Sequence, residues 1–180
     1  TAKLILAGLL ASTALPALGL TRARAEDVPH FTFPSVDGGS YDTAQWRGSP
    51  VLVVNTASMC GFAGQLADMQ ALHDAYAPRG LVVLAVPSDD FNQELASGAE
   101  AKEYCELQYG LTLPMTDILH VAKGDVHPFY AWARAQTGFV PQWNFNKVLL
   151  DPQGRIAGTW GSFVKPGGRQ IMGAASPYLT

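Results

Sequence analysis

The stretch that decides the fold is VLVVNTASMCGFAGQLADMQALHDAYAPRGLVVLAVP, residues 51–87. Residues 51–58 and 81–87, near its two ends, are continuous apolar runs, as expected of strands buried on both faces of a sheet. Between them, apolar residues recur at helical spacing over 62–77, and the Pro-Arg-Gly at 78–80 ends the helix. A strand, a helix and a strand in this order predict a βαβ unit with a right-handed crossover.

Three further segments extend this unit. FTFPSVDGGSYD, residues 31–42, predicts two short strands around a turn at Asp37-Gly38-Gly39, where glycine tolerates positive φ. A helix is predicted from Ser97, with Glu100 three residues later in a capping-box pattern, to about Gln108. Residues 127–136 (HPFYAWARAQ) form another helix candidate.

The C-terminal third completes the pattern. Residues 143–163 predict two strands joined by a turn at 151–154, Asp-Pro-Gln-Gly. Residues 165–180 are predicted to be weakly helical at best, because three glycines and a proline oppose a helix there. The element order predicts an α/β fold, a thioredoxin-like three-layer sandwich with a mixed central sheet and helices on both faces.

The N-terminal residues have the layout of a secretory signal peptide. Residues 1–20 are mostly apolar, and Ala23-Arg24-Ala25 is a small-x-small cleavage pattern. We therefore expect residues 1–25 to be a signal peptide cleaved after about Ala25, and residues 26–180 to be one periplasmic or secreted domain without stable membrane insertion. The alternative is that the segment is retained as an N-terminal anchor.

Composition excludes several function classes. Cleavage would remove three of the 12 basic residues and none of the 15 acidic ones, which leaves a net charge of −6. A nucleic-acid-binding surface needs a basic stripe, and this chain has the opposite sign of charge. The four histidines are dispersed and no C-x-x-C occurs, so no metal site and no cofactor are predicted.

Cys60 stands where the first buried strand ends and the helix begins. Open α/β sheets form their crevice at this edge, and a helix N-terminus stabilises a thiolate. Disulfide exchange needs a second cysteine at position 63, where this chain has Ala63. A single activated thiolate is instead suited to attack a peroxide O–O bond and become a sulfenic acid. The competing interpretation is a buried, unreactive thiol.

Such a step needs hydrogen-bond donors at the sulfur and at the leaving oxygen, and neutral N–H groups serve well. Gln93 follows the second strand of the βαβ unit, and Trp143-Asn144 precede the next predicted strand. Each has a structural alternative: an exposed loop amide for Gln93, a core anchor for Trp143 and a turn residue for Asn144. Spacing alone does not select these three residues.

Four ordered motifs resemble those of the glutathione peroxidase family, from about Phe31 to Phe163. They are VNTASMCGF (54–62), GLVVLAVPSDDFNQE (80–94), HPFY (127–130) and WNFNKVLLDPQG (143–154). The resemblance implies that Cys60 is the nucleophile and that Gln93, Trp143 and Asn144 complete a catalytic tetrad. Two stretches depart from the family's usual pattern: CGFAGQL replaces CGFTPQY, and the loop before Gln93 is one residue shorter.

The resemblance also implies partners. The substrate would be hydrogen peroxide or an organic hydroperoxide, and a thiol reductant, a thioredoxin-like protein or glutathione, would regenerate the enzyme. Two-cysteine members of the family carry a resolving cysteine on or after the helix that here contains Cys105, so Cys105 is a possible resolving residue, with a packed helical thiol as the alternative. The segment between ARAQ and WNF is short, as in the compact, often monomeric members.

The sequence therefore predicts an exported, thiol-dependent peroxidase of the oxidative stress response that acts through a Cys60 sulfenic acid. The alternative from another class is a non-catalytic protein on the same scaffold, which would bind a ligand or partner in the crevice or on the acidic surface.

Overall fold

The computed structural model of the protein describes residues 28–180, so the predicted signal peptide lies outside the described residues. Its centre is a four-stranded sheet in the order β4-β3-β5-β6. The strands are β3 (Val51–Thr56), β4 (Val82–Pro87), β5 (Lys147–Leu150) and β6 (Ile156–Trp160). β3 pairs with β4 in parallel and with β5 antiparallel, and β5 pairs antiparallel with β6. The predicted mixed sheet is confirmed.

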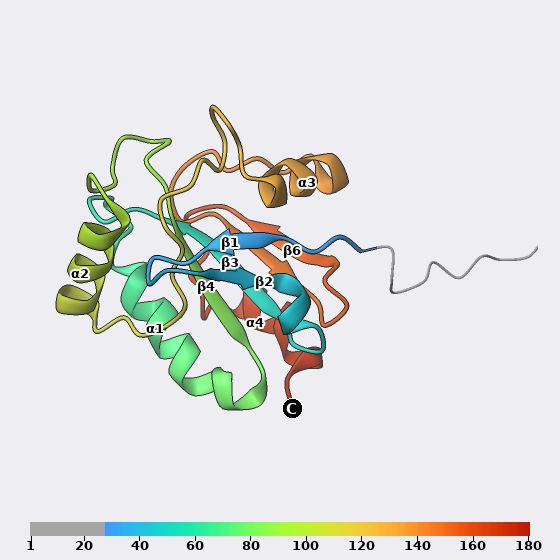
Figure 1. Ribbon diagram of the computed structural model, residues 1–180. Coiled ribbons are helices and arrows are strands. Elements are labelled where there is room, and N and C mark those ends of the chain that lie inside the picture. The colour runs from blue at the N-terminus through green and yellow to red at the C-terminus, as the bar shows by residue number, and fades with distance from the viewer. Residues whose placement is uncertain (1–27) are drawn as a thin grey trace, which may run out of the picture.

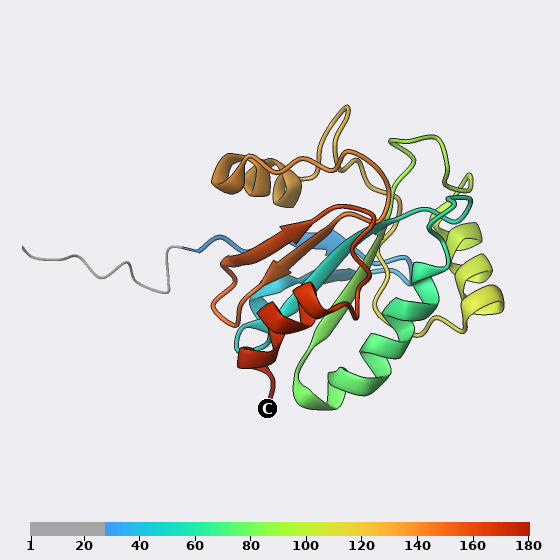
Figure 2. The same ribbon diagram turned by 180° about the vertical axis from the view of Figure 1, so that it is seen from behind.

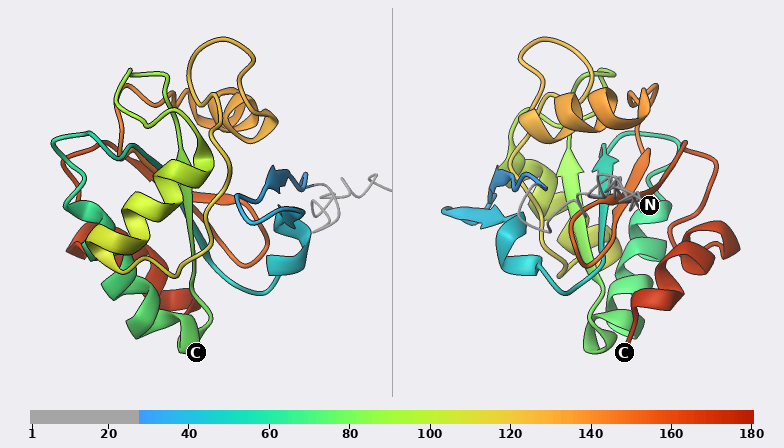
Figure 3. Two further views of the ribbon diagram at one scale, coloured as in Figure 1. Left: turned by 60° about the vertical axis from the view of Figure 1, so that its left-hand side comes forward. Right: turned by 90° about the vertical axis from the view of Figure 1, so that its right-hand side faces the viewer.

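Helices cover both faces of this sheet (Figure 1 and Figure 2). α1 (Gln65–Tyr76) and α4 (Arg169–Ala175) lie on one face, and α2 (Gly98–Tyr109) packs beside α1. α3 (Pro128–Thr137) lies on the opposite face, which Figure 3 shows from two further directions. Within residues 28–180, no helix combines the length and apolar character that crossing a bilayer requires.

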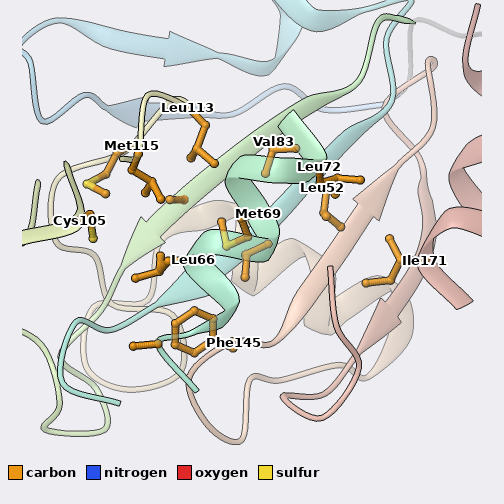
Figure 4. Close-up of a cluster of buried hydrophobic side chains, with 14 of the residues drawn as sticks. Leu52, Leu66, Met69, Leu72, Val83, Cys105, Leu113, Met115, Phe145 and Ile171 are labelled. Atoms are coloured by element: carbon orange, nitrogen blue, oxygen red, sulfur yellow. The ribbon is translucent and has the colours of Figure 1, made fainter. Parts of the chain in front are cut away.

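The alternation of side chains along β3 explains why two cores form. Leu52 and Val54 face α1 and α4, whereas Val51 and Val53 face α3. Because successive side chains of a strand point to opposite faces, a continuous apolar run is what a strand covered on both sides requires. Figure 4 shows the first core, where Leu66 and Met69 of α1 pack over the sheet and Cys105 of α2 joins the same cluster.

A separate two-stranded hairpin precedes the sheet. β1 (Thr32–Pro34) and β2 (Ser40–Asp42) pair antiparallel around the predicted Asp-Gly-Gly turn. Phe33 of β1 is fully buried, with its ring 5.4 Å from that of Phe129 of α3. The remaining elements of residues 28–180 are three short 3₁₀ helices: η2 (Thr43–Trp46), η3 (Ala77–Arg79) and η4 (Ser176–Tyr178).

The predicted helix signals act as expected. The Ser97 side-chain oxygen accepts the N–H of Glu100 at 3.2 Å and caps α2, which satisfies one of the unpaired donors of the first turn. After α1 and η3, Gly80 has φ of 92°, a left-handed conformation that stops the helical backbone.

The C-terminal segment differs from its prediction. Residues expected to be weakly helical at best form α4 and then η4. The physical reason is tertiary: Ile171 and Ala175 are almost completely buried in the core beside α1 and the sheet. This burial outweighs the low helix propensity of Gly173 within α4 and of Gly167 and Gly168 just before it.

Candidate functional site

Cys60 lies in the turn that connects β3 to α1, ahead of the first helical residue, Gln65. Its side chain is mostly buried, with the residue 6% exposed. The N–H of Ala63 donates to the Cys60 carbonyl at 2.8 Å, and the N–H of Phe62 donates to the Cys60 Sγ at 3.4 Å. The sulfur therefore faces a backbone N–H donor of the turn that leads into α1. Phe62 was not identified from the sequence, because a backbone donor leaves no signal in the residue type.

Gln93 lies in the loop between β4 and α2, and this loop is bonded to the Cys60 turn at two consecutive positions. The Gln93 carbonyl accepts the N–H of Met59 at 2.9 Å. The carboxylate of Glu94 accepts the N–H of Ser58 at 3.1 Å. These two bonds fix the loop against the residues that lead into Cys60.

Asn144 is fully buried and contacts Gln93 directly. Its Nδ2 donates to Gln93 Oε1 at 3.0 Å, across 51 positions of sequence. The bond occupies the acceptor end of the Gln93 amide, so the NH₂ end of Gln93 is the one that can donate to a ligand. The Oδ1 of Asn144 is buried without a hydrogen-bond partner. A buried amide oxygen of this kind is expensive to leave unpaired and is typical of a functional position.

Trp143 is 41% exposed, so it is not the core anchor that was the structural alternative for it. Its ring centroid lies 5.4 Å from that of Phe91, which belongs to the same loop as Gln93. The Trp143 carbonyl accepts Nδ2 of Asn55 at 3.1 Å, which ties this residue to the end of β3. The indole therefore lies at the sheet edge where β3 and β4 end.

The structure thus gathers the four predicted residues at one edge of the sheet, Gln93 and Asn144 in direct contact and the Cys60 turn bonded to the Gln93 loop. In residues 28–180 the sulfur forms no hydrogen bond with Gln93, Trp143 or Asn144, and its donor is the Phe62 N–H.

Sequence reasoning missed a group of buried polar residues beneath this site. Lys147 is completely buried in β5, and its ammonium donates to Gln65 Oε1 at 2.6 Å. Burial lowers the pKa of Lys147 to about 8. The one available signal was polarity inside an apolar run: Lys147 interrupts FNKVLL, and Asn55 interrupts VLVVNT.

Cys105 lies on α2 with the residue only 3% exposed (Figure 4). It belongs to the same buried cluster as Cys60. Burial, with a smaller contribution from the negative charge of Glu94, raises the pKa of the Cys105 thiol to about 12. Burial also raises the pKa of Glu94. In this conformation Cys105 is a neutral, packed thiol and not a nucleophile. Both cysteines are free.

Two of the histidines, His127 and His120, have structural partners. His127 caps the start of α3 and stacks on Phe33 with ring centroids 4.5 Å apart. His120 pairs with the buried carboxylate of Asp90 at 2.6 Å. In the described part of the chain, no three His, Cys, Asp or Glu side chains are grouped so that they could hold a metal ion.

Comparison with known proteins gives consistent matches. The family model described as glutathione peroxidase matches residues 29–134, which contain Cys60, Gln93 and Cys105. The Synechocystis sp. protein named hydroperoxy fatty acid reductase gpx1 is 34% identical over 147 residues, covering 76% of this chain and 87% of that protein. The Schizosaccharomyces pombe glutathione peroxidase-like peroxiredoxin gpx1 is 36% identical over 135 residues, covering 72% and 85%.

Solved structures agree on the fold. The apo form of Trgpx superposes with a TM-score of 0.60 at 30% identity and covers 81% of this chain and 93% of its own. T. cruzi GPX1 gives a TM-score of 0.63 at 24% identity, with coverages of 82% and 93%. A thiol:disulfide interchange protein from Chlorobium tepidum, with a TM-score of 0.61 at 18% identity, shares the thioredoxin-like fold alone.

Proposed function

This chain belongs to the glutathione peroxidase family and is a thiol-dependent peroxidase; on that premise we propose that Cys60 is the thiol with which it reduces hydroperoxides. Membership of this family implies a hydroperoxide substrate and a thiol reductant. It therefore argues against the alternative of a non-catalytic binding protein. The observation that carries the assignment to Cys60 is that its turn is hydrogen-bonded to the loop of Gln93, and that Gln93 is hydrogen-bonded to Asn144.

The chemical step is a displacement at oxygen. The Cys60 thiolate attacks one oxygen of the O–O bond, the S–O bond forms, and the other oxygen leaves as an alcohol or water after it takes up a proton. The product at Cys60 is a sulfenic acid. A leaving oxygen that develops negative charge is stabilised by N–H donors already in place. We assign this role to the NH₂ end of Gln93, the indole N–H of Trp143 and the buried Asn144.

We further propose that organic hydroperoxides are substrates along with hydrogen peroxide. Two exposed apolar side chains stand near the Cys60 turn: Met59, which is 60% exposed, and Phe163, which is 90% exposed and packs edge-on against Phe62 with ring centroids 5.2 Å apart. Apolar groups at such positions can contact the hydrocarbon part of a hydroperoxide. One relative is named a hydroperoxy fatty acid reductase, which is consistent with such a substrate.

The experiment that tests Cys60 is chemical trapping. Reduced protein is treated with one equivalent of hydrogen peroxide in the presence of dimedone, which reacts with sulfenic acids, and the digest is examined by mass spectrometry. We expect the adduct on the Cys60 peptide, because only this thiol faces a backbone donor at the sheet edge. The matched control is Cys105→Ser, which should form at least as much of the same adduct. No adduct at Cys60 in either protein would refute the assignment.

For the return to the thiol, we propose that Cys105 is the resolving residue. Cys60 and Cys105 belong to one buried cluster. The Glu94 carboxylate links their surroundings: it accepts the N–H of Ser58, two positions before Cys60, and its charge contributes to the raised pKa of Cys105. The Cys105 sulfur would attack the sulfenic sulfur, lose its proton and release water, which forms a 60–105 disulfide. Because the pKa of the packed Cys105 thiol is raised, α2 must open locally before this step. A dithiol protein of the thioredoxin kind would then reduce the disulfide.

This proposal predicts a specific crosslink. After oxidation with one equivalent of peroxide and no dimedone, digestion without reductant should yield a joined peptide that contains Cys60 and Cys105. Mild urea, below the unfolding transition, should speed its formation because local opening of α2 becomes more frequent. If Cys60 is fully oxidised and the joined peptide is absent, an external thiol reduces the sulfenic acid directly and Cys105 is a packing residue.

We propose that the protein is exported and acts as a monomer. The support for export is the apolar N-terminal segment with its small-x-small pattern, and the support for a monomer is the short segment between α3 and β5.

A further inference from the structure

A cluster of six buried polar residues lies beneath the proposed site. All are less than a tenth exposed; they are Asn55, Gln65, Asn144, Asn146, Lys147 and Ser162. They come from β3, α1, β5, the turn before β5 and the loop after β6. Buried polar groups are costly unless they are paired, so a group this large in a small domain calls for an explanation beyond packing.

Ser162 forms hydrogen bonds with four other residues of this cluster. Its hydroxyl donates to the Asn144 carbonyl at 2.6 Å and accepts Nδ2 of Asn146 at 3.1 Å. Its carbonyl accepts Nε2 of Gln65 at 2.6 Å and the Lys147 ammonium at 3.4 Å. Side chain and main chain of one residue therefore connect the turn that carries Asn144 with the first residue of α1.

The turn held by Ser162 has an unfavourable backbone. Phe145 has φ of 61°, a left-handed conformation that a bulky residue adopts only when its surroundings require it. The Phe145 N–H donates to the Asn55 carbonyl at 2.6 Å, and Nδ2 of Asn146 donates to the Trp143 carbonyl at 2.7 Å. The main chain that carries Trp143 and Asn144 is thus held by Asn146 within the turn and by Asn55 and Ser162 outside it.

We propose that Ser162 is a positioning residue of the peroxidase reaction. It holds the Trp143-Asn144 turn in its left-handed form and ties it to the start of α1, the helix that follows Cys60. It does not touch the reacting atoms itself. This inference rests on the proposed function, because it gives Trp143 and Asn144 a role at the peroxide.

The test is Ser162→Ala, which removes the hydroxyl and both of its bonds but keeps the carbonyl that receives Gln65 and Lys147. Two second-order rates at Cys60 are measured at one pH by mass spectrometry of its peptide: oxidation by hydrogen peroxide and alkylation by iodoacetamide. Oxidation should slow about 10- to 100-fold, because displacing a catalytic group by about 1 Å costs rates of this order. Alkylation needs the thiolate but no donor at a leaving oxygen, so it should change less than about threefold.

Two variants separate positioning from general destabilisation. Ser162→Thr keeps a hydroxyl and should restore oxidation to within about threefold of the unmodified protein, because the hydroxyl carries both bonds that hold the turn. Ser176→Ala removes the same chemical group from an exposed serine whose hydroxyl donates to the Met172 carbonyl at 2.5 Å, and it should leave both rates unchanged. A role in packing alone would lower the two rates together or neither of them.

If Ser162→Ala fails to fold, Asn146→Ala tests the same link, because it removes the bonds to Ser162 and to the Trp143 carbonyl. The positioning role would be overturned if either variant folds and its Cys60 is oxidised at a rate within twofold of that in the unmodified protein. The role of Cys60 would be left intact by this result. Absence of Cys60 oxidation in the unmodified protein would instead overturn the proposed function.

Discussion

Replacement of Cys60 by serine is expected to abolish peroxide reduction. A serine hydroxyl is not ionised near neutral pH and is a poor nucleophile toward a peroxide oxygen, so turnover should fall by more than about 10³-fold. Steady-state turnover is measured with hydrogen peroxide and with an organic hydroperoxide, each with thioredoxin and with glutathione as the electron donor. The loss should be the same for all four combinations, because every one of them depends on the same thiol.

The control for this substitution is a measurement of thermal unfolding, which shows whether the variant is folded. Cys60 lies at the edge of the core, and replacing its sulfur with oxygen changes no other core residue, so the thermal unfolding midpoint should move by only a few degrees. Cys105→Ser separates the two cysteines: it should keep oxidation of Cys60 but lose turnover with thioredoxin. Turnover of Cys60→Ser at the level of the unmodified protein would eliminate Cys60 as the nucleophile.

The second large effect is an unusual pH dependence of stability caused by Lys147. Burial lowers the pKa of this ammonium in the native state to about 8 from its ordinary value of 10.5. Below pH 8 the native protein must hold a charge in the core, which is unfavourable. Between pH 8 and 10.5 the native state has lost this proton while the unfolded chain still binds it. Stability therefore rises with pH in this window.

The contribution is isolated by comparison with Lys147→Met, which keeps an unbranched side chain of similar length but has no charge. Urea unfolding of both proteins is followed from pH 7 to pH 10.5. Relative to the variant, the unmodified protein should gain about 2 to 3 kcal/mol of unfolding free energy over this range. Cys105 and Tyr130, whose pKa values burial raises, act in the opposite direction but equally in both proteins. Parallel stability curves would show that Lys147 does not titrate in this window.

At the site, the sequence indicated candidate residues but not their arrangement. Cys60 was identifiable because the end of an apolar run followed by a helical pattern marks a position at a sheet edge. Gln93 and Asn144 were identified by resemblance to a family, and spacing alone did not select them. Their direct contact across 51 positions depends on how two loops pack at that edge, which no local pattern encodes.

Local rules of the chain determined most of the scaffold. Apolar periodicity specified β3, α1 and β4, and glycine and serine marked helix ends, because these signals act within a few residues. The position of a single thiol between strand and helix was fixed in the same way.

Only the tertiary structure decided which polar groups are buried and what they bond. It placed the ammonium of Lys147 inside the core, made Ser162 the link between α1 and the Trp143-Asn144 turn, and turned a glycine-rich C-terminus into α4. The physical reason is that the free energy of a buried polar group depends on partners brought from distant parts of the chain. Periodicity predicts which side of an element faces inward, but not which residues that side will contact.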